Sequence, residues 1–264
     1  MKEKRDPEKP FVLYLAHTMM HTIIDASDRF RGKSEGGLYG DVVEEFDYET
    51  GRLLDALDAL KLRENTLVIY TSDNGPWNQD KYTKNKKGHP KDSIFWGDSG
   101  PLRNGKGSPY EGGYRLPCIV RWPGNVPAGQ ESAAIFASVD FMPTFAELCG
   151  FEIPKDRRID GTDQTDLLLG KRKTGRDYFY FNNAGVRKGK WKYLRANAYF
   201  HGYAVEKDRA KVEELYDLEA DLGERNNLAE KYPEEVAELK ALMSSIEGKN
   251  SGTPSSTPNG RSKK

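Results

Sequence analysis

The sequence has few of the features that would place it in a specialised class of protein. It has only two cysteines, Cys118 and Cys149, in 264 residues, too few for a disulfide framework, and their spacing is not that of a metal motif. No apolar run is long enough to cross a bilayer as a helix. Lys and Arg together number 41, as do Asp and Glu, so no net charge indicates a nucleic acid or a membrane as partner.

The sequence also has little apolar character overall. Its mean hydropathy is −0.79, which predicts long polar loops and at least one disordered end. The 14 Tyr, 11 Phe and 4 Trp still provide material for a core. The charged N-terminus is followed only by FVLYLA, about half of the apolar core that a signal peptide needs. We therefore expect no export signal in this chain, and the localisation stays open.

The first half of the chain has the pattern of an α/β domain. Apolar runs at 11–16 and 67–72 indicate buried strands, and residues 41–60 place apolar side chains at helical spacing. Strand, helix and strand in this order predict a right-handed crossover and a parallel sheet. A third strand is expected at 118–122, and a helix is expected at 137–150, where Gly150 provides the C-cap.

The pattern changes after Pro154. Short aromatic runs at 178–181, 191–195 and 214–218 predict a small antiparallel sheet. Pro233 opens a helix with one apolar face, formed by Val236, Leu239, Leu242, Met243 and Ile246. The sequence thus predicts four parts: an α/β part at 1–153, a connector at 154–175, a small α+β subdomain at 176–248 and a disordered tail at 249–264.

Polar side chains follow or precede the predicted strands at one edge of the sheet. His17 and His21 follow the first strand, Asp73 and Asn74 follow the second, and Lys106 lies on the loop that leads to the third. A carboxylate next to an amide carbonyl suits Ca²⁺ or Mg²⁺, although Asp-Asn-Gly alone is more often only a turn. The His17-x-x-x-His21 spacing lacks the glutamate of a zinc helix, so a general acid, an anion contact or simple loop packing is a better interpretation.

The stretch around Lys106 resembles a nucleotide-binding loop only in part. Gly100, Gly105 and Lys106 fit G-x-x-x-x-G-K-[ST], but Gly107 stands where Ser or Thr should bind magnesium. Pro101 interrupts the loop, and no strand directly precedes it. Two alternatives remain: a solvated surface lysine, or a lysine presented by flanking glycines to a different anion.

Six stretches in chain order resemble the sulfatases of the alkaline-phosphatase-like superfamily. The first three are FVLYLAHTMMHT, TLVIYTSDNGPW and PLRNGKGSPYEGGYRLPCIVRWPG, and the others are VDFMPTFAELCG, IDGTDQTDLLLG and ELYDLEADLGERNNLA. The resemblance runs from about Pro10 to Lys240 and is closest to the arylsulfatase A or N-acetylgalactosamine-6-sulfatase type. It implies part of a mixed or parallel sheet sandwiched by helices, followed by a small antiparallel sheet with a packed helix.

The resemblance also implies roles for four residues in sulfuric ester hydrolysis. Asp73 and Asn74 would be Ca²⁺ ligands, His21 would assist the leaving group, and Lys106 would bind a sulfate oxygen and the leaving-group oxygen. Sulfate esters, including sulfated carbohydrates, would be the substrates. Met20 and Ile23 replace the prolines that usually flank the histidine of this segment.

One part of the family pattern is missing from the chain. Sulfatases use a formylglycine nucleophile made from C/S-x-P-x-R, and neither Cys118, which is followed by IVR, nor Cys149, which is followed by GFEI, fits this motif. The N-terminal aspartate pair of the family's Ca²⁺ site is also absent. We therefore expect the C-terminal part of a sulfatase, incomplete on its own.

Two other functions stay open. A phosphoesterase or phosphonate hydrolase of the same superfamily would need further His and Asp ligands. A non-catalytic protein that binds sulfated glycans would use the region 76–100, which is rich in Lys and Trp. A merely solvated loop is the simpler interpretation of that region.

Overall fold

The computed structural model describes residues 6, 9–21, 24–77, 97–198, 200 and 211–250. Most of the lysine-rich region 76–100 and the predicted tail from 251 onward lie outside these residues, as does Ile23. Among the residues described, no helix has the length and apolar character needed to cross a membrane.

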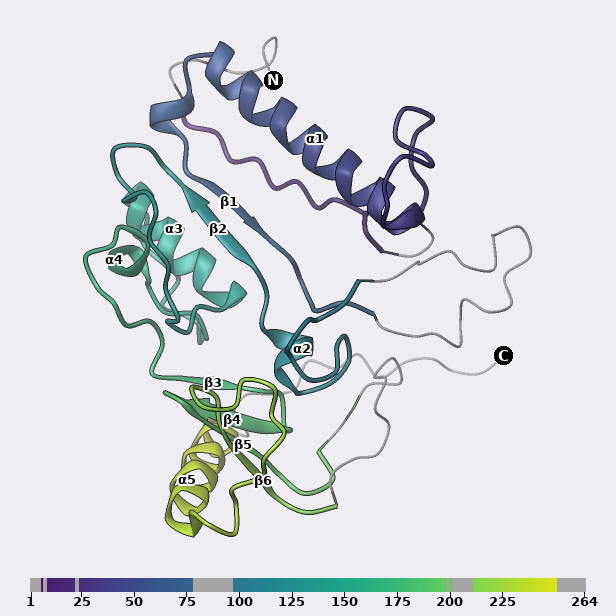
Figure 1. Cartoon of the computed structure of the whole chain (residues 1–264). Coiled ribbons are helices and arrows are strands. Elements are labelled where there is room, and N and C mark those ends of the chain that lie inside the picture. The colour runs from purple at the N-terminus through teal and green to yellow at the C-terminus, as the bar shows by residue number, and fades with distance from the viewer. Residues whose placement is uncertain are drawn as a thin grey trace, which may run out of the picture.

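The first half of the chain contains two strands with helices on either side. Its elements are α1 (Gly37–Ala59), η1 (Arg63–Asn65), β1 (Val68–Thr71), α2 (Glu111–Tyr114), β2 (Cys118–Arg121), η3 (Ser138–Asp140), α3 (Phe141–Cys149) and α4 (Thr165–Leu168). In Figure 1, α1 lies to one side of the β1–β2 ribbon, and α3 and α4 lie to the other. The helices expected at 41–60 and 137–150 are confirmed, and the second ends at a left-handed Gly150 with φ of 70°.

The two strands run antiparallel. Val68 pairs with Arg121, and Thr71 pairs with Cys118, so the carboxyl end of β1 meets the amino end of β2. The strands predicted at 67–72 and 118–122 are confirmed, as is the α/β class. The register matters for the site because the loop after β1 and the loop before β2 emerge at the same edge.

The predicted strand at 11–16 is wrong for this structure, and so is the parallel pairing that it implied. The segment has no assigned strand, and Val12 and Tyr14 are each 88% exposed. Figure 1 shows it running extended beside α1, where the ring of His17 contacts that of Phe46 at 4.6 Å between centroids. A strand needs a hydrogen-bonded neighbour and a cover for its apolar face, and the described part of the chain gives this segment no ladder.

The start of α1 is fixed by a buried carboxylate. Asp41 is 2% exposed, and its oxygens accept the backbone N–H groups of Gly32, Lys33 and Ser34 at 2.7, 3.0 and 2.8 Å. Burial opposes ionisation of Asp41, but these three donors outweigh it and hold the pKa of its carboxyl below the usual value. The loop before the helix is therefore folded around one side chain of the helix.

The C-terminal sheet has four strands in the order β3-β4-β5-β6, all antiparallel. Their bounds are β3 (Tyr178–Tyr180), β4 (Gly185–Lys188), β5 (Trp191–Leu194) and β6 (Glu214–Asp217), followed by α5 (Pro233–Asn250). The three predicted strands are confirmed, whereas β4 was missed. Its sequence GVRK has a single β-branched residue. The main sign of a strand here is therefore the turn residues on either side, Asn182 and Asn183 before it and Gly189 after it.

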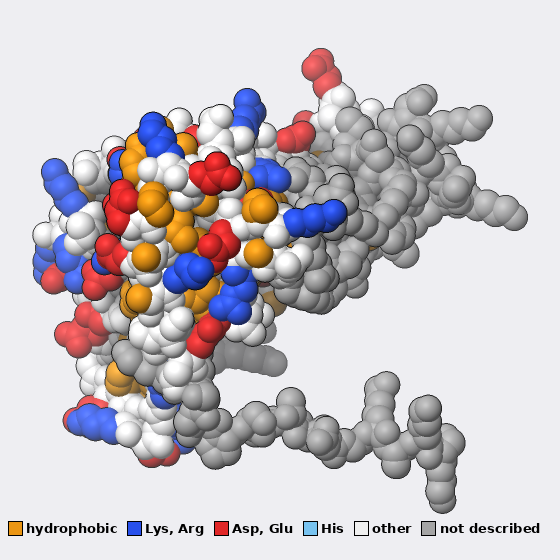
Figure 2. Space-filling view, turned by 90° about the horizontal axis from the view of Figure 1, so that it is seen from below, with side chains coloured by type: hydrophobic (Ala, Val, Ile, Leu, Met, Phe, Trp, Pro, Cys, Tyr) orange, Lys and Arg blue, Asp and Glu red, His pale blue; other side chains and the backbone are white. Residues whose placement is uncertain are grey.

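The two faces of this sheet pack against different partners. Val186, Tyr193 and Leu215 form one cluster with the predicted apolar face of α5. Leu194 and Tyr216, which point to the opposite face because side chains alternate along a strand, form a second cluster with Tyr110 of the first half. On the surface seen from below, Figure 2 shows Lys and Arg interspersed with Asp and Glu among apolar side chains. The domain boundaries near 153, 175 and 248 remain a prediction.

Two loops at the edge of the β1–β2 pair pack backbone against backbone. Gly75 donates its N–H to the carbonyl of Gly113 at 3.1 Å, and Lys106 donates its N–H to the carbonyl of Pro76 at 2.8 Å. A Cβ added at Gly75 would lie 1.7 Å from the carbonyl oxygen of Gly112. Only glycine permits this close approach of the two backbones. If the loops separated or slid, the two main-chain hydrogen bonds would be lost.

Asp41 gives a pH-dependent contribution to stability. Because its folded pKa is depressed, the contribution is present above the unfolded value of about 3.9 and is lost as the pH falls through the folded pKa. We expect Asp41→Asn to lower the free energy of unfolding by about 2 kcal/mol at pH 7. Urea titrations of both proteins between pH 2 and 7 should show that the difference between their free energies of unfolding becomes smaller as the pH falls. A difference that is constant over this range would contradict the assignment.

The contact at Gly75 predicts a strong and local steric effect. We expect Gly75→Ala to destabilise the protein by about 1–3 kcal/mol, because the new methyl group meets the Gly112 carbonyl. Gly51→Ala is the matched control: Gly51 lies inside α1 with nothing within 4 Å of an added Cβ. That change should stabilise the helix by about 0.5–1 kcal/mol. Chemical denaturation of both variants measures the difference, and similar effects would contradict the packing described.

Candidate functional site

The candidate site lies where β1 ends and β2 begins. Asp73 and Asn74 follow β1 directly, and the loop that carries Lys106 leads through α2 into β2. Sequence reasoning expected these residues at one edge of a parallel sheet. The structure places their two loops together for a different reason, namely the antiparallel pairing of Thr71 with Cys118.

Lys106 is held in place by its own main chain. Its N–H group binds the carbonyl of Pro76, three residues after Asp73, and its side chain is half-buried. Gly105 before it is buried, and Gly107 after it has a φ of 87°, in the left-handed region that favours glycine. The loop closes at its base, where Gly112 donates its N–H to the carbonyl of Arg103 at 2.9 Å.

Asp73 and Asn74 are accessible at the strand end. Asp73 is exposed, and Asn74 is half-buried with its side-chain amide donating to the carbonyl of Gly75 at 3.3 Å. That bond uses the nitrogen of Asn74 and leaves its Oδ1 as an acceptor beside the Asp73 carboxylate. The donor types suit Ca²⁺, but two side chains are far fewer than the six to eight oxygens that this ion takes. Within the described residues, no group of three His, Cys, Asp or Glu side chains lies close enough to hold a metal.

The histidines lie on the segment that precedes α1. His21 is exposed, and its backbone N–H donates to the carbonyl of Thr18 at 3.1 Å. His17 is also exposed and accepts the N–H of Met19 at its Nδ1 at 3.2 Å. The backbone contacts that join the Lys106 loop to residues 75–76 do not include His21. Main-chain bonds thus join the Lys106 loop to the residues that directly follow Asp73 and Asn74, and His21 lies on a different segment of the chain.

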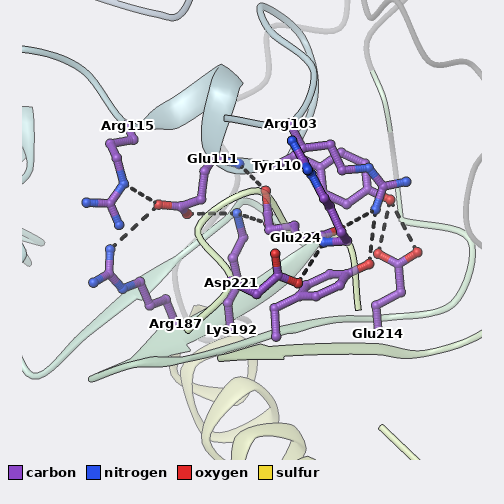
Figure 3. A network of polar contacts seen from close by, with 11 residues as sticks. Arg103, Tyr110, Glu111, Arg115, Arg187, Lys192, Glu214, Asp221 and Glu224 are labelled. Atoms are coloured by element: carbon purple, nitrogen blue, oxygen red, sulfur yellow. Dashed lines mark hydrogen bonds and ion pairs between the residues drawn. The ribbon is translucent and has the colours of Figure 1, made fainter. Parts of the chain in front are cut away.

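A buried network under the Lys106 loop was not predicted from the sequence. Figure 3 shows Glu111, at the start of α2, facing Lys192 of β5 and Glu224 of the loop after β6. Burial opposes ionisation of Glu111, but Lys192 and Arg115 outweigh it and hold its pKa below the usual value. Burial dominates at Glu224 and raises its pKa. Charged residues far apart in sequence carry no periodic signal, so only the fold reveals that they meet.

Family models match the chain in two overlapping regions. A model described as sulfatase matches residues 1–151, and one described as the C-terminal part of N-sulphoglucosamine sulphohydrolase matches residues 105–249. The N-acetylgalactosamine-6-O-sulfatase of Bacteroides thetaiotaomicron is 36% identical over 250 residues, which are 90% of this chain and 47% of that protein. Human steryl-sulfatase is 38% identical over 190 residues, 71% of this chain and 31% of that protein.

Solved structures agree with these matches. A sulfatase structure from a study of glycosaminoglycan metabolism by Bacteroides thetaiotaomicron has a TM-score of 0.76 at 35% identity, covering 91% of this chain and 51% of that one. A sulfatase from Pseudoalteromonas has a TM-score of 0.74 at 24% identity, covering 90% and 48%, and shows the fold alone.

The coverage of the relatives is partial, but the match to the family extends over most of this chain. The chain spans about half the length of the sulfatases that it matches along nine-tenths of its own length. The sulfatase model alone covers more than half of the 264 residues. The chain belongs to the sulfatase family.

Proposed function

We propose that this chain forms part of a sulfuric ester hydrolase and contributes one side of its active site. The observation that carries the proposal is the main-chain bond between Lys106 and Pro76. It joins the loop of a half-buried lysine, flanked by glycines, to the residues that directly follow Asp73 and Asn74. Asp73 and Asn74 offer hard oxygen ligands for Ca²⁺, and a bound Ca²⁺ together with the Lys106 ammonium would suit the binding of an oxyanion.

Lys106 would bind the sulfate group. Its ammonium offsets negative charge on a sulfate oxygen and on the oxygen that leaves as the S–O bond breaks. Gly107 has no side chain to obstruct the approach of a bulky tetrahedral group to Lys106. The bond to Pro76 already fixes the main chain of Lys106, so the loop would lose little conformational entropy when the ester binds.

His21 would act at the leaving group. A protonated imidazole can donate to the departing ester oxygen, so that the product leaves as an alcohol. Its exposure in this structure is suited to contact with a ligand that approaches from solvent.

The family implies a Ca²⁺ ion and a formylglycine nucleophile, and the residues of this chain supply only part of what these two groups need. Asp73 and Asn74 would hold Ca²⁺ together with ligands from elsewhere, and a bound Ca²⁺ would offset charge on the sulfate oxygens. The formylglycine motif is absent from the sequence, so the residues of this chain do not supply that nucleophile.

The substrate class that we favour is a sulfated carbohydrate. One relative is named for 6-O-sulfated N-acetylgalactosamine, and a solved structure at 27% identity, with a TM-score of 0.58, is a complex with its substrate D-glucosamine-2-N,6-O-disulfate. Glycan binding without hydrolysis is the alternative for the isolated chain, and most of its candidate surface at 76–100 lies outside the described residues. The family match makes the phosphoesterase alternative the weaker one.

The chain alone should show little turnover. We expect purified protein with Ca²⁺ and an aryl sulfate to release phenol no faster than a double variant, His21→Ala with Lys106→Ala, because the nucleophile motif is absent. Phenolate absorbance over hours gives the rate. Turnover clearly above that of the double variant would contradict this expectation.

A chimera tests the proposed function directly. In it, this chain replaces the matching half of the Bacteroides relative, with which it is 36% identical. We expect hydrolysis of 6-O-sulfated N-acetylgalactosamine, and a fall in kcat/KM of about 10²–10³-fold on Lys106→Ala. Lys171→Ala, at an exposed lysine of the connector, should keep the activity of the parent chimera. A folded chimera that releases no sulfate, or in which both lysine variants behave alike, would contradict the proposal.

A further inference from the structure

A lysine is completely buried between the Lys106 loop and the C-terminal sheet. Lys192 of β5 is 0% exposed, and its Nζ lies 2.9 Å from Glu111 Oε1 and 2.8 Å from Glu224 Oε1. The first contact is a hydrogen bond, whereas the second is an ion pair without hydrogen-bond geometry. Lysine is rarely buried unless it is paired, so the three groups depend on one another.

The two carboxylates come from different parts of the chain. Glu111 begins α2, five residues after Lys106, and Glu224 lies in the loop after β6. The N–H of Glu111 also donates to Glu224 Oε2 at 2.6 Å. Arg115 and Arg187 complete the cluster around Glu111 at 2.7 and 3.7 Å. The cluster therefore ties the C-terminal end of the Lys106 loop to the C-terminal sheet, as Figure 3 shows.

The N-terminal end of the same loop is tied to the same subdomain. Arg103 donates to the carbonyl of Glu224 at 3.1 Å and to the hydroxyl of Tyr216 at 3.0 Å. Its guanidinium lies 3.8 Å from the ring centroid of Tyr110, whose own hydroxyl binds Glu214 at 3.0 Å. Both ends of the segment that presents Lys106 are thus held by residues of the C-terminal sheet and of the loop after β6.

We propose that Lys192 is a positioning residue, which holds the Lys106 loop against the end of β1 through Glu111 and Glu224. The inference rests on the proposed role of Lys106 in binding a sulfate ester. It gives the C-terminal sheet a part in that role: the sheet contributes no side chain to the candidate site but fixes the loop that does. Lys192 acts through its contacts with Glu111 and Glu224. The bond between Gly75 and Gly113 then holds the loop next to the residues that follow Asp73 and Asn74.

The experiment compares three variants of the full chain. Lys192→Met removes the ammonium and leaves two carboxylates buried. The double variant Lys192→Met/Glu224→Gln removes one charge of each sign, so it stays testable if the single variant does not fold. Lys190→Met is the matched control, because Lys190 lies just before β5 with an exposed side chain paired to Asp217. Thermal unfolding first establishes that each variant is folded.

Amide hydrogen exchange then reports on the loop. We expect the amides of Gly75, Lys106 and Gly112 to exchange at least about tenfold faster in the double variant than in the parent. Amides of Val186 and Leu215, on the α5 side of the sheet, should stay within about threefold, and Lys190→Met should change none of these rates. Loop amides that exchange at the parent rate in a folded double variant would overturn the proposal.

A second measurement uses the active chimera. There the double variant should lower kcat for the sulfate ester at least about tenfold with a smaller change in KM, because a misplaced Lys106 loses stabilisation of the transition state. Faster exchange with unchanged kcat would overturn the positioning role. An inactive parent chimera would instead count against the proposed function, and the exchange measurement would still decide the constraint on the loop.

Discussion

The buried ion pairs of Lys192 are the constraint on which the candidate site depends. An ammonium without solvent must be neutralised by carboxylates at contact distance, and here those carboxylates belong to Glu111 and Glu224. Since Glu111 opens α2, satisfying the charge also places that helix, the Lys106 loop before it and the start of β2 after it. The electrostatic requirement of one side chain in the C-terminal sheet is therefore met by one carboxylate from the first half of the chain and one from the loop after β6.

Main-chain contacts transmit this placement to the strand end. Gly75, Gly112 and Gly113 have no side chains to separate the two loops, so the carbonyl and N–H groups of one loop reach the other directly. Contacts of this kind are short and directional, and they leave little freedom for sliding. The antiparallel register of β1 and β2 then ensures that both loops emerge at the same edge.

Elements with a strong local pattern could be predicted from the sequence. The apolar stripe of α5, the glycine that ends α3 and the apolar runs of β1 and β2 are all visible without the fold. The prediction at 11–16 was wrong because an apolar run indicates burial, whereas a strand also needs a neighbour, which the described residues do not give it. The site residues Lys106, Asp73 and Asn74 were predicted from strand-end positions and family resemblance, and their roles remain a prediction. The contacts among Glu111, Lys192 and Glu224 could not be predicted, because their meeting depends on tertiary structure alone.

The two unlike faces of the C-terminal sheet have a consequence for how the subdomain folds. Lys192 points to the face that receives Glu111, and its neighbour Tyr193 points into the apolar cluster with α5. Side chains alternate along a strand, so a slip of β5 by one residue would move the ammonium into that apolar cluster and bring the tyrosine under α2. Such a slip would break the contacts of the ammonium with Glu111 and Glu224. The buried lysine thus also favours the observed strand register over a register shifted by one residue, and so disfavours an incorrectly paired sheet.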